Sequence, residues 1–180
     1  METLKCIETR RSIRKYAARP VDAETVRALI RTASMAPSWK NSQTVRYYAL
    51  DSVRKDAFAE ACCGVYANNC ARAKACGVLV ALVTERGISG YDPDGTASTP
   101  LESHWESFDA GIAAQTLCLA AHDMGLGSLI MGIYDPQKAA EELELPENMQ
   151  VSALICLGWA DEEPAARPRK SVDSLLTWVK

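Results

Sequence analysis

Two apolar runs limit the fold of this chain more than any other feature of its sequence. Residues 77–84 read GVLVALVT and residues 149–160 read MQVSALICLGWA, so polar side chains are nearly absent from both. A strand that is apolar on both faces has to be covered on both faces, as in a sheet with helices packed on each side. The two runs therefore predict long buried strands in a sheet that lies between helices.

Other segments carry the signals of helix starts and of shorter strands. Asp22 suits the N-cap of a helix over 23–35, and Ser52 is predicted to open a helix over 53–63. The remaining predicted elements are strands over 45–51 and 128–133, a helix that begins at Asp135 and Pro136, and a short helix at the carboxy-terminal end.

The most apolar helix is predicted to run from Thr99 to about residue 124. Thr99 suits its N-cap, Pro100 its first helical position and Glu102 the partner position of a capping box. Residues 110–121, AGIAAQTLCLAA, are apolar almost all round the helix. This composition predicts a buried central helix.

The order of these elements indicates the fold class. Helices and strands mix without a strict βαβ alternation, so we expect an α+β fold, and the absence of repeats or an internal boundary predicts one domain over 1–180. Residues 86–100 are rich in Gly, Pro, Ser and Asp and predict a long loop. Gly125 and Gly127 are expected at the end of the central helix.

Composition excludes several classes of protein. The 180-residue chain has 20 Lys and Arg against 23 Asp and Glu, whereas a general nucleic-acid binder is strongly basic. No stretch approaches 18 uninterrupted apolar residues, so no membrane-spanning helix is predicted. The amino terminus, METLKCIETRR, lacks the apolar core of a signal peptide, and we expect a cytoplasmic protein.

The seven cysteines allow two interpretations. Four of them lie between residues 62 and 76 and could in principle ligate a metal, but the chain has no C-x-x-C pair. Cys118 and Cys156 sit in apolar runs, where a thiol behaves as a small hydrophobe. We expect reduced, structural cysteines and no metal site.

A basic cluster, RRSIRKY at 10–16, contrasts with the acidic balance of the whole chain. One interpretation is a cationic helix end in solvent. However, Arg10, Ser12 and Arg14 offer two forked cations and a hydroxyl within a short span, and such a set suits a phosphate monoester. The cluster therefore indicates either a solvated surface or a binding site for one small anion.

The same cluster is the first of five segments that resemble the nitroreductase family of FMN-dependent oxidoreductases. The segments are, in chain order, RRSIRKY at 10–16, APSWKNSQ at 36–43, DAGIAAQTLCLAAHDMGLGS at 109–128, IMGIYD at 130–135 and RPRKS at 167–171. They span almost the whole chain in the family's order. The resemblance implies a nitroreductase-like fold, with a mostly antiparallel central sheet flanked by helices and a long buried central helix.

The resemblance also implies a homodimer with two FMN sites at the subunit interface. The residues that it places around FMN are Arg10, Arg11, Ser12, Arg14, Pro37, Ser38, Trp39, Asn41, Asn68, Met131, Gly132, Arg167 and Arg169. Within this set it assigns the phosphate to Arg10, Ser12 and one of the two carboxy-terminal arginines. Pro37, Ser38 and Trp39 are assigned to the other subunit.

Three further roles follow from the resemblance. Arg14 and Asn68 are assigned to the flavin pyrimidine, where a cation stabilises the negative charge of the reduced ring. Gly132 is assigned a backbone N–H toward N5 or O4. From the residues alone, Asn68 and its neighbour Asn69 are equally compatible with a turn, and Gly132 with a strand bulge.

The implied activity is hydride transfer from NAD(P)H through flavin to a nitroaromatic, quinone or flavin acceptor, in a ping-pong cycle. Tyr91, His104 and Trp105 are weaker candidates for the face that the acceptor uses. Alternatives are another flavin reaction on the same fold (dehalogenation, ene reduction or flavin breakdown), a non-catalytic flavin carrier, or a metal-binding cysteine cluster. Trp39 and Thr44 depart from the family pattern, and the large side chain of Trp39 is expected either to stack over the cofactor or to narrow the space for the acceptor.

Overall fold

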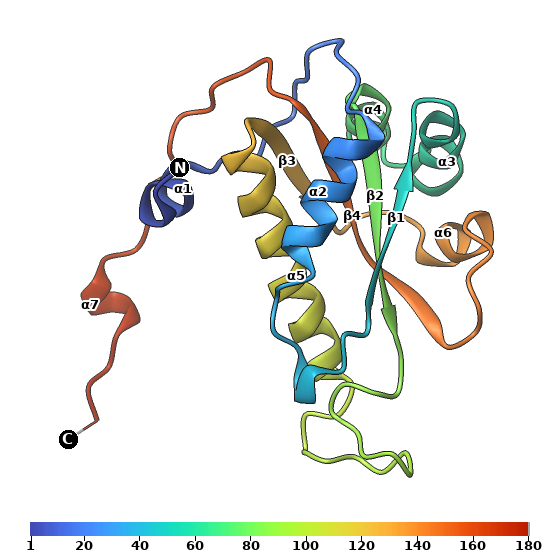
Figure 1. Ribbon diagram of the computed structural model, residues 1–180, viewed down its shortest axis with the longest axis vertical. Helices are drawn as coiled ribbons and strands as arrows, with labels where there is room; N and C mark the ends of the chain where they lie inside the picture. The colour runs from blue at the N-terminus through green and yellow to red at the C-terminus, as the bar shows by residue number, and fades with distance from the viewer. Residues whose placement is uncertain (180) are drawn as a thin grey trace.

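The two apolar runs form the central strands of a four-stranded antiparallel sheet (Figure 1). The computed structural model describes residues 1–179 of the chain. Its strands are β1 (Val45–Leu50), β2 (Val78–Glu85), β3 (Leu126–Met131) and β4 (Met149–Trp159), in the order β1-β2-β4-β3. All three neighbouring pairs are antiparallel, which confirms the expected α+β class and antiparallel sheet.

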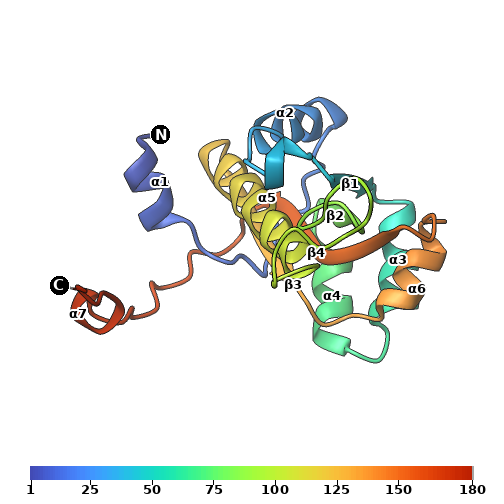
Figure 2. The same ribbon diagram turned by 90° about the horizontal axis from the view of Figure 1, so that it is seen from below.

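Helices cover both faces of this sheet (Figure 2). The helices are α1 (Thr3–Thr9), α2 (Ala23–Ala33), the 3-10 helix η1 (Trp39–Asn41), α3 (Arg54–Cys63), α4 (Ala67–Ala75), α5 (His104–Asp123), α6 (Pro136–Glu142) and α7 (Val172–Leu175). Helices α2 and α5 lie on one face, and α3, α4 and α6 lie on the other. Along β2, Val80 packs in the core under α2 and α5, while Leu79 and Ala81 pack in the core under α3, α4 and α6.

Two of the predicted helix caps are confirmed. The side chain of Asp22 accepts a hydrogen bond from the backbone N–H of Thr25 at 2.7 Å, at the start of α2. The side chain of Asp135 accepts from the N–H groups of Gln137 and Lys138 at the start of α6, at 3.1 and 3.0 Å. In both cases a carboxylate satisfies N–H groups that have no partner inside the helix.

The predicted start of α3 is wrong, because a different residue caps this helix. Helix α3 begins at Arg54, and Ser52 provides no cap. Instead, Asp51 at the end of β1 accepts from the N–H groups of Val53 and Arg54 at 3.0 and 3.1 Å. The carboxylate one residue earlier therefore replaces the serine hydroxyl.

The predicted start of α5 is wrong for a related reason. Helix α5 begins at His104, five residues after the predicted N-cap. The hydroxyl of Thr99 accepts from the N–H of Leu101 at 2.9 Å and from the indole N–H of Trp105 at 3.2 Å, so it closes a turn. Glu102 has a φ of 45°, which is incompatible with a continuous helix through 99–104.

Two other elements differ from the prediction. Strand β3 covers 126–131 in place of 128–133, so Gly132 follows the strand and is not a bulge within it. Helix α4 was not predicted, and it contains Asn68 and Asn69 in its first turn, so neither residue lies in a turn between elements.

Helix α5 is buried on one side only. Its buried side includes Leu117, Cys118 and Ala121, but Phe108 is 59% exposed and Gly111 is also exposed. Residues 108, 111 and 112 are spaced to form one stripe along the helix. The prediction of a helix buried all round is therefore wrong for the single chain.

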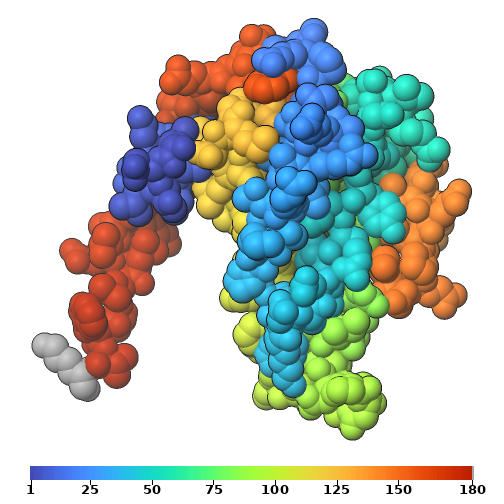
Figure 3. All heavy atoms as spheres, viewed as in Figure 1, coloured from blue at the N-terminus to red at the C-terminus, as the bar shows by residue number. Residues whose placement is uncertain are grey.

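Residues 160–179 form a carboxy-terminal arm that leads away from the sheet (Figures 1 and 3). Open space separates the end of the arm, around α7, from α5 in Figure 3. The end of the arm exposes large apolar side chains: Leu175, Leu176, Trp178 and Val179. Across residues 1–179, no helix has the length and apolar character needed to cross a membrane.

All seven cysteines are buried and unbridged. Burial raises the pKa of the Cys62 thiol to about 12 and that of Cys63 to about 11. Thiols with pKa values this high are protonated at neutral pH and are therefore poor nucleophiles and poor metal ligands. In the described part of the chain, no three His, Cys, Asp or Glu side chains are grouped so as to hold a metal ion.

Candidate functional site

The basic segment at 10–16 is fixed beside the ends of two strands. The N–H of Ile13 donates to the carbonyl of Ser128 in β3 at 2.9 Å, and the N–H of Ala17 donates to the carbonyl of Trp159 in β4 at 2.9 Å. Such backbone hydrogen bonds hold the segment in one register on the sheet. The backbone of residues 10–14 therefore has a defined position beside the sheet.

Two glycines allow the segment to lie this close to the strands. A Cβ on Gly127 would lie 2.7 Å from the side chain of Ile13, and one on Gly158 would lie 2.8 Å from the ring of Tyr16. Gly125 has a φ of 81° after the end of α5, as expected of a C-cap glycine. Gly127 is not part of the helix cap as predicted. Its lack of a side chain makes room for Ile13.

A cavity of about 430 Å³ brings the basic segment together with the carboxy-terminal arm. Residues from both segments line it: Arg10, Arg11, Ser12, Arg14, Pro164, Ala165, Ala166, Arg167 and Arg169. Six of these are among the predicted phosphate and flavin ligands, from parts of the sequence about 150 positions apart. Within residues 1–179, none of the five arginines forms an ion pair with a carboxylate.

Hydrogen bonds show how two of these arginines are held. The guanidinium of Arg11 donates to the carbonyls of Glu8 and Arg10 at 2.7 and 2.9 Å, so it caps the carboxy-terminal end of α1. The guanidinium of Arg14 donates to the carbonyl of Ser12 at 3.0 Å. Arg11 thus has a structural role in the chain itself.

Glu162 joins the arm to the basic segment and was not found by sequence reasoning. One oxygen of its carboxylate accepts from the backbone N–H groups of Arg14 and Lys15. The N–H of Asp161 also donates to the carbonyl of Lys15, at 3.0 Å. These bonds set the start of the arm, and with it Arg167 and Arg169, against the basic segment. No local pattern around Glu162 signals this contact.

The second predicted group of ligands lies at the opposite end of α5. The backbone N–H of Trp39 donates to both carboxylate oxygens of Asp109, at 3.1 and 3.0 Å. At the other end, the hydroxyl of Thr9 lies 2.8 Å from Nε2 of His122. His122 lies thirteen positions after Asp109 in the helix, which is about 20 Å along the axis. One chain therefore does not bring Ser38 and Trp39 to the arginine cavity.

Asp109 and Glu106 are buried carboxylates on α5 that anchor the segments around Trp39. Asp109 also accepts from the hydroxyl of Ser89 at 2.7 Å. Glu106 accepts from the N–H of Gly87 at 2.7 Å and from the amide of Gln150 at 3.2 Å. Sequence reasoning missed both, although two acids at the start of an apolar helix are an available signal, because buried charges need partners.

Aromatic side chains gather where the loop at 86–100 meets η1. The ring centroids of Trp39 and Trp105 lie 4.8 Å apart, and those of Trp105 and Phe108 lie 5.1 Å apart. Lys40 forms an ion pair with Asp92 of the loop, with 2.9 Å between Nζ and Oδ1. The structure thus joins the predicted residues Trp39 and Trp105.

The other predicted residues at the Trp39 end of α5 make fewer contacts. Tyr91 is half-buried and pairs through its backbone with Ala97 within the loop. His104 is exposed at the first position of α5, and Asn41 is exposed in η1 with a φ of 56°. The indole N–H of Trp39 is buried and has no hydrogen-bond partner in residues 1–179.

The last predicted group surrounds the end of β3. The side chain of Met131 is buried, with its sulfur 3.9 Å from that of Cys156, so only the backbone of Met131 can reach a ligand. Gly132 is exposed, and a Cβ added there would meet nothing within 4 Å. Asn68 is exposed on α4, whereas Asn69 donates to the carbonyl of Ile133 at 2.9 Å.

Comparison with known proteins identifies the family. The profile of the Nitroreductase family matches residues 7–159, which is most of the chain. The chain belongs to the nitroreductase family. This nitroreductase-family chain is 32% identical over 171 residues to an NADPH-flavin oxidoreductase of Vibrio harveyi, which covers 93% of this chain and 69% of the relative.

Two further comparisons describe the range of the family. The chain is 30% identical over 177 residues to a 5,6-dimethylbenzimidazole synthase of Rhodospirillum rubrum, covering 86% of this chain and 80% of the relative. Its fold matches the structure of the NADPH:FMN oxidoreductase from Vibrio harveyi complexed with NAD⁺, with a TM-score of 0.81 and 27% identity. That match covers 99% of this chain and 77% of the other.

Proposed function

We propose that this protein is an FMN-dependent oxidoreductase that takes hydride from NAD(P)H and reduces a nitroaromatic, quinone or flavin acceptor in a ping-pong cycle. Membership of the nitroreductase family supports this function, and so do the relatives named NADPH-flavin and NADPH:FMN oxidoreductase. The observation that carries it is the cavity with five arginines whose guanidinium groups form no ion pair with a carboxylate among the described residues.

The residues of this cavity fit the phosphate of FMN. Guanidinium groups form forked, charge-assisted hydrogen bonds with phosphate oxygens. Arg10, Ser12 and one or both of Arg167 and Arg169 would hold the phosphate, because Arg11 is already engaged at the end of α1. Arg14 would lie near the pyrimidine ring. When bound, FMN supplies the redox chemistry, since it accepts hydride and passes electrons to an acceptor.

Each site would be completed by a second copy of the chain. Ser38 and Trp39 lie about 20 Å along α5 from the level of the arginine cavity, so a partner has to supply them. The unpartnered indole N–H of Trp39 and the exposed stripe of Phe108 and Gly111 support such a homodimer. The apolar end of the arm gives a second surface that a partner would cover.

The remaining positions would surround the ring and the acceptor. Gly132 would offer its backbone N–H, because nothing in the chain itself occupies the space beside it. Asn68 is exposed close to this point, next to the engaged Asn69. Tyr91, His104 and Trp105 would border the acceptor face of the partner's site. The seven free thiols support a reducing compartment, the cytoplasm.

Stopped-flow spectroscopy tests this function. The purified protein, loaded with FMN under anaerobic conditions, should lose its flavin absorbance when mixed with NADH or NADPH. A second mixing with a quinone or nitroaromatic should restore the absorbance without a ternary complex. A flavin that NAD(P)H does not bleach would contradict the enzyme and support the flavin carrier.

A second candidate function is another flavin reaction on the same fold. The relative named 5,6-dimethylbenzimidazole synthase supports this candidate. Among such reactions, flavin breakdown differs from the proposed function in the fate of the flavin. An oxidoreductase recovers its FMN after each cycle, whereas flavin breakdown consumes it. Chromatography of total flavin before and after many turnovers distinguishes them.

A further inference from the structure

A second cavity lies outside the proposed flavin site. It has a volume of about 540 Å³, which is within the range of small-molecule sites. Its walls come from the linker at 17–21, the first turns of α2, the end of β1 and the residues between α4 and β2. It shares no lining residue with the arginine cavity. Most of the wall is made of small apolar side chains, including Ala18, Val21 and Val26.

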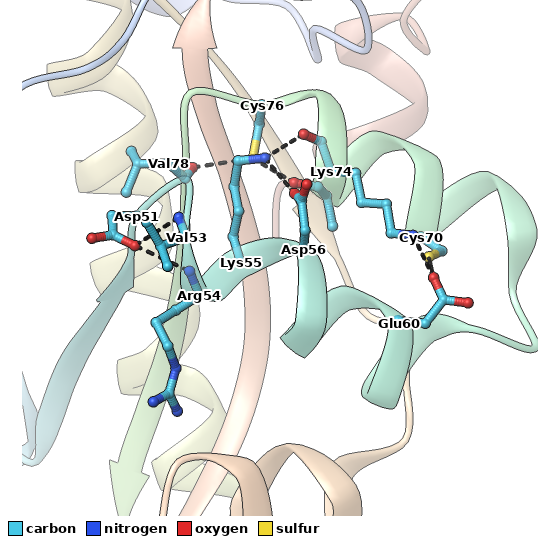
Figure 4. Close-up of polar contacts among 11 residues, drawn as sticks. Asp51, Val53, Arg54, Lys55, Asp56, Glu60, Cys70, Lys74, Cys76 and Val78 are labelled. Atoms are coloured by element: carbon cyan, nitrogen blue, oxygen red, sulfur yellow. Dashed lines mark hydrogen bonds and ion pairs between the residues drawn. The ribbon is translucent and has the colours of Figure 1, made fainter.

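Lys55 gives this apolar cavity a buried cation. Its side chain is 7% exposed and reaches from the first turn of α3 toward the start of β2 (Figure 4). The ammonium group donates to Oδ1 of Asp56 at 2.7 Å and to the carbonyl of Lys74. An ammonium group has three donors, and no partner for the third is present among residues 1–179.

The burial of this lysine is costly without a compensating ligand. Asp56, its ion-pair partner, is 56% exposed, so water screens that interaction strongly. A buried ammonium group with incomplete pairing loses more hydration than it regains. An apolar side chain would fill this position at lower cost if packing were its only task.

Two more cations stand at the cavity, and the one carboxylate there is already engaged. Arg19 and Arg27 line the cavity and have no ion-pair partner in the described part of the chain. The guanidinium of Arg19 lies 3.6 Å from the ring centroid of Trp159. Asp51 also lines the cavity, but it caps α3 through Val53 and Arg54. The cavity therefore has an apolar wall and an excess of positive charge.

We propose that this cavity is a second ligand site, which binds a small monocarboxylate with an apolar chain or ring. The carboxylate of the ligand would accept a hydrogen bond from the free N–H of Lys55 and would contact Arg19 or Arg27. The apolar body of the ligand would lie against Ala18, Val21 and Val26. The site is independent of the proposed flavin function, because the two cavities share no lining residue.

Octanoate is a suitable probe, with 1-octanol as its uncharged match and inorganic sulfate as an anion without an apolar body. The experiment is an NMR titration of ¹⁵N-labelled protein, carried out with and without saturating FMN. Octanoate should shift the amide signals of 17–19, Val21 and 75–78 in both cases. It should bind about tenfold or more tightly than either control, since a charge-assisted hydrogen bond adds to apolar burial.

Three variants locate the site. Lys55→Met should weaken octanoate about tenfold or more and leave 1-octanol unchanged. Ala18→Trp, at an exposed linker position, should weaken both by filling the cavity, and it tests the site if Lys55→Met fails to fold. Arg14→Ala should change neither. Octanoate shifts confined to 10–14, an equal affinity for 1-octanol, or unchanged binding in Ala18→Trp would each overturn the proposal.

Discussion

The backbone N–H of Trp39 donates to both oxygens of the buried Asp109 carboxylate, at 3.1 and 3.0 Å. The same carboxylate accepts a hydrogen bond from the hydroxyl of Ser89 at 2.7 Å. One side chain of α5 thus holds both η1 and the loop at 86–100 in place. Because Trp39 is a proposed contact to the partner's flavin, Asp109 would connect the core of one subunit to the cofactor site of the other in the proposed dimer.

Replacement of Asp109 by Asn should loosen both segments. Asparagine is neutral and offers one acceptor oxygen where the carboxylate offers two, so the N–H of Trp39 loses one acceptor and both remaining bonds lose their charge assistance. We expect the free energy of unfolding to fall by about 1–3 kcal/mol. Urea unfolding followed by tryptophan fluorescence measures it. Asp123→Asn, at an exposed position of the same helix, is the matched control, and an equal effect of both variants would contradict this role of Asp109.

Replacement of Arg10 by Ala should weaken FMN but not riboflavin. Riboflavin lacks the phosphate that Arg10 is proposed to hold, so only FMN loses a charge-assisted contact. The expected loss for FMN is about 10- to 100-fold in Kd, measured by flavin fluorescence quenching. Arg31→Ala on the exposed side of α2 should leave both ligands unchanged. If riboflavin loses as much affinity as FMN, Arg10 is not a phosphate ligand.

Mixing two inactive variants should restore part of the activity if each site uses two chains. One variant carries Arg10→Ala and Arg14→Ala, and the other carries Ser38→Ala and Trp39→Ala. A mixed dimer collects all changes in one site and leaves the other site intact. Random exchange makes half the dimers mixed, so about a quarter of full activity should return. Exchange shown by native mass spectrometry without any return of activity would rule out the shared site.

Gly127→Ala and Gly132→Ala should both weaken FMN binding but should differ in their effect on stability. The new Cβ at 127 would lie 2.7 Å from Ile13, so it should displace the basic segment and lower stability by about 1–3 kcal/mol, with weaker FMN binding. The new Cβ at 132 meets nothing, so stability should hold within about 0.5 kcal/mol while flavin binding weakens. Thermal unfolding and FMN titration separate the two effects. Unchanged FMN affinity in Gly132→Ala would remove Gly132 from the site.

Stability should decline above pH 9 because of two buried thiols. Burial raises the pKa of Cys62 to about 12 and of Cys63 to about 11, so the folded chain keeps protons that the unfolded chain releases. This contribution is complete below the unfolded pKa and is lost as pH rises toward the folded values. The loss is about 1.4 kcal/mol per pH unit for each thiol. Urea unfolding at pH 8, 9 and 10 should show a shallower decline in a Cys62→Ala, Cys63→Ala variant than in the natural chain.

The sequence by itself determined the elements whose signals are local. The apolar runs of β2 and β4 require cover on both faces, and the carboxylates of Asp22 and Asp135 mark helix starts within three residues of the N–H groups that they bind. The basic segment was visible as a cluster because its residues are adjacent. In each case the atoms that interact, or the pattern that forces burial, lie within one short window of the chain.

Only the tertiary structure decided how distant segments meet. The strand order β1-β2-β4-β3 and the contact of Glu162 with the basic segment bring Arg167 and Arg169 to Arg10. The hydrogen bond from Trp39 to Asp109 joins residues that are 70 positions apart. The hydroxyl of Thr99 accepts a hydrogen bond from Trp105 and does not cap the helix, so α5 begins at His104. These outcomes depend on which groups compete for one partner in a packed core, and that competition is settled by shape and burial across the whole chain.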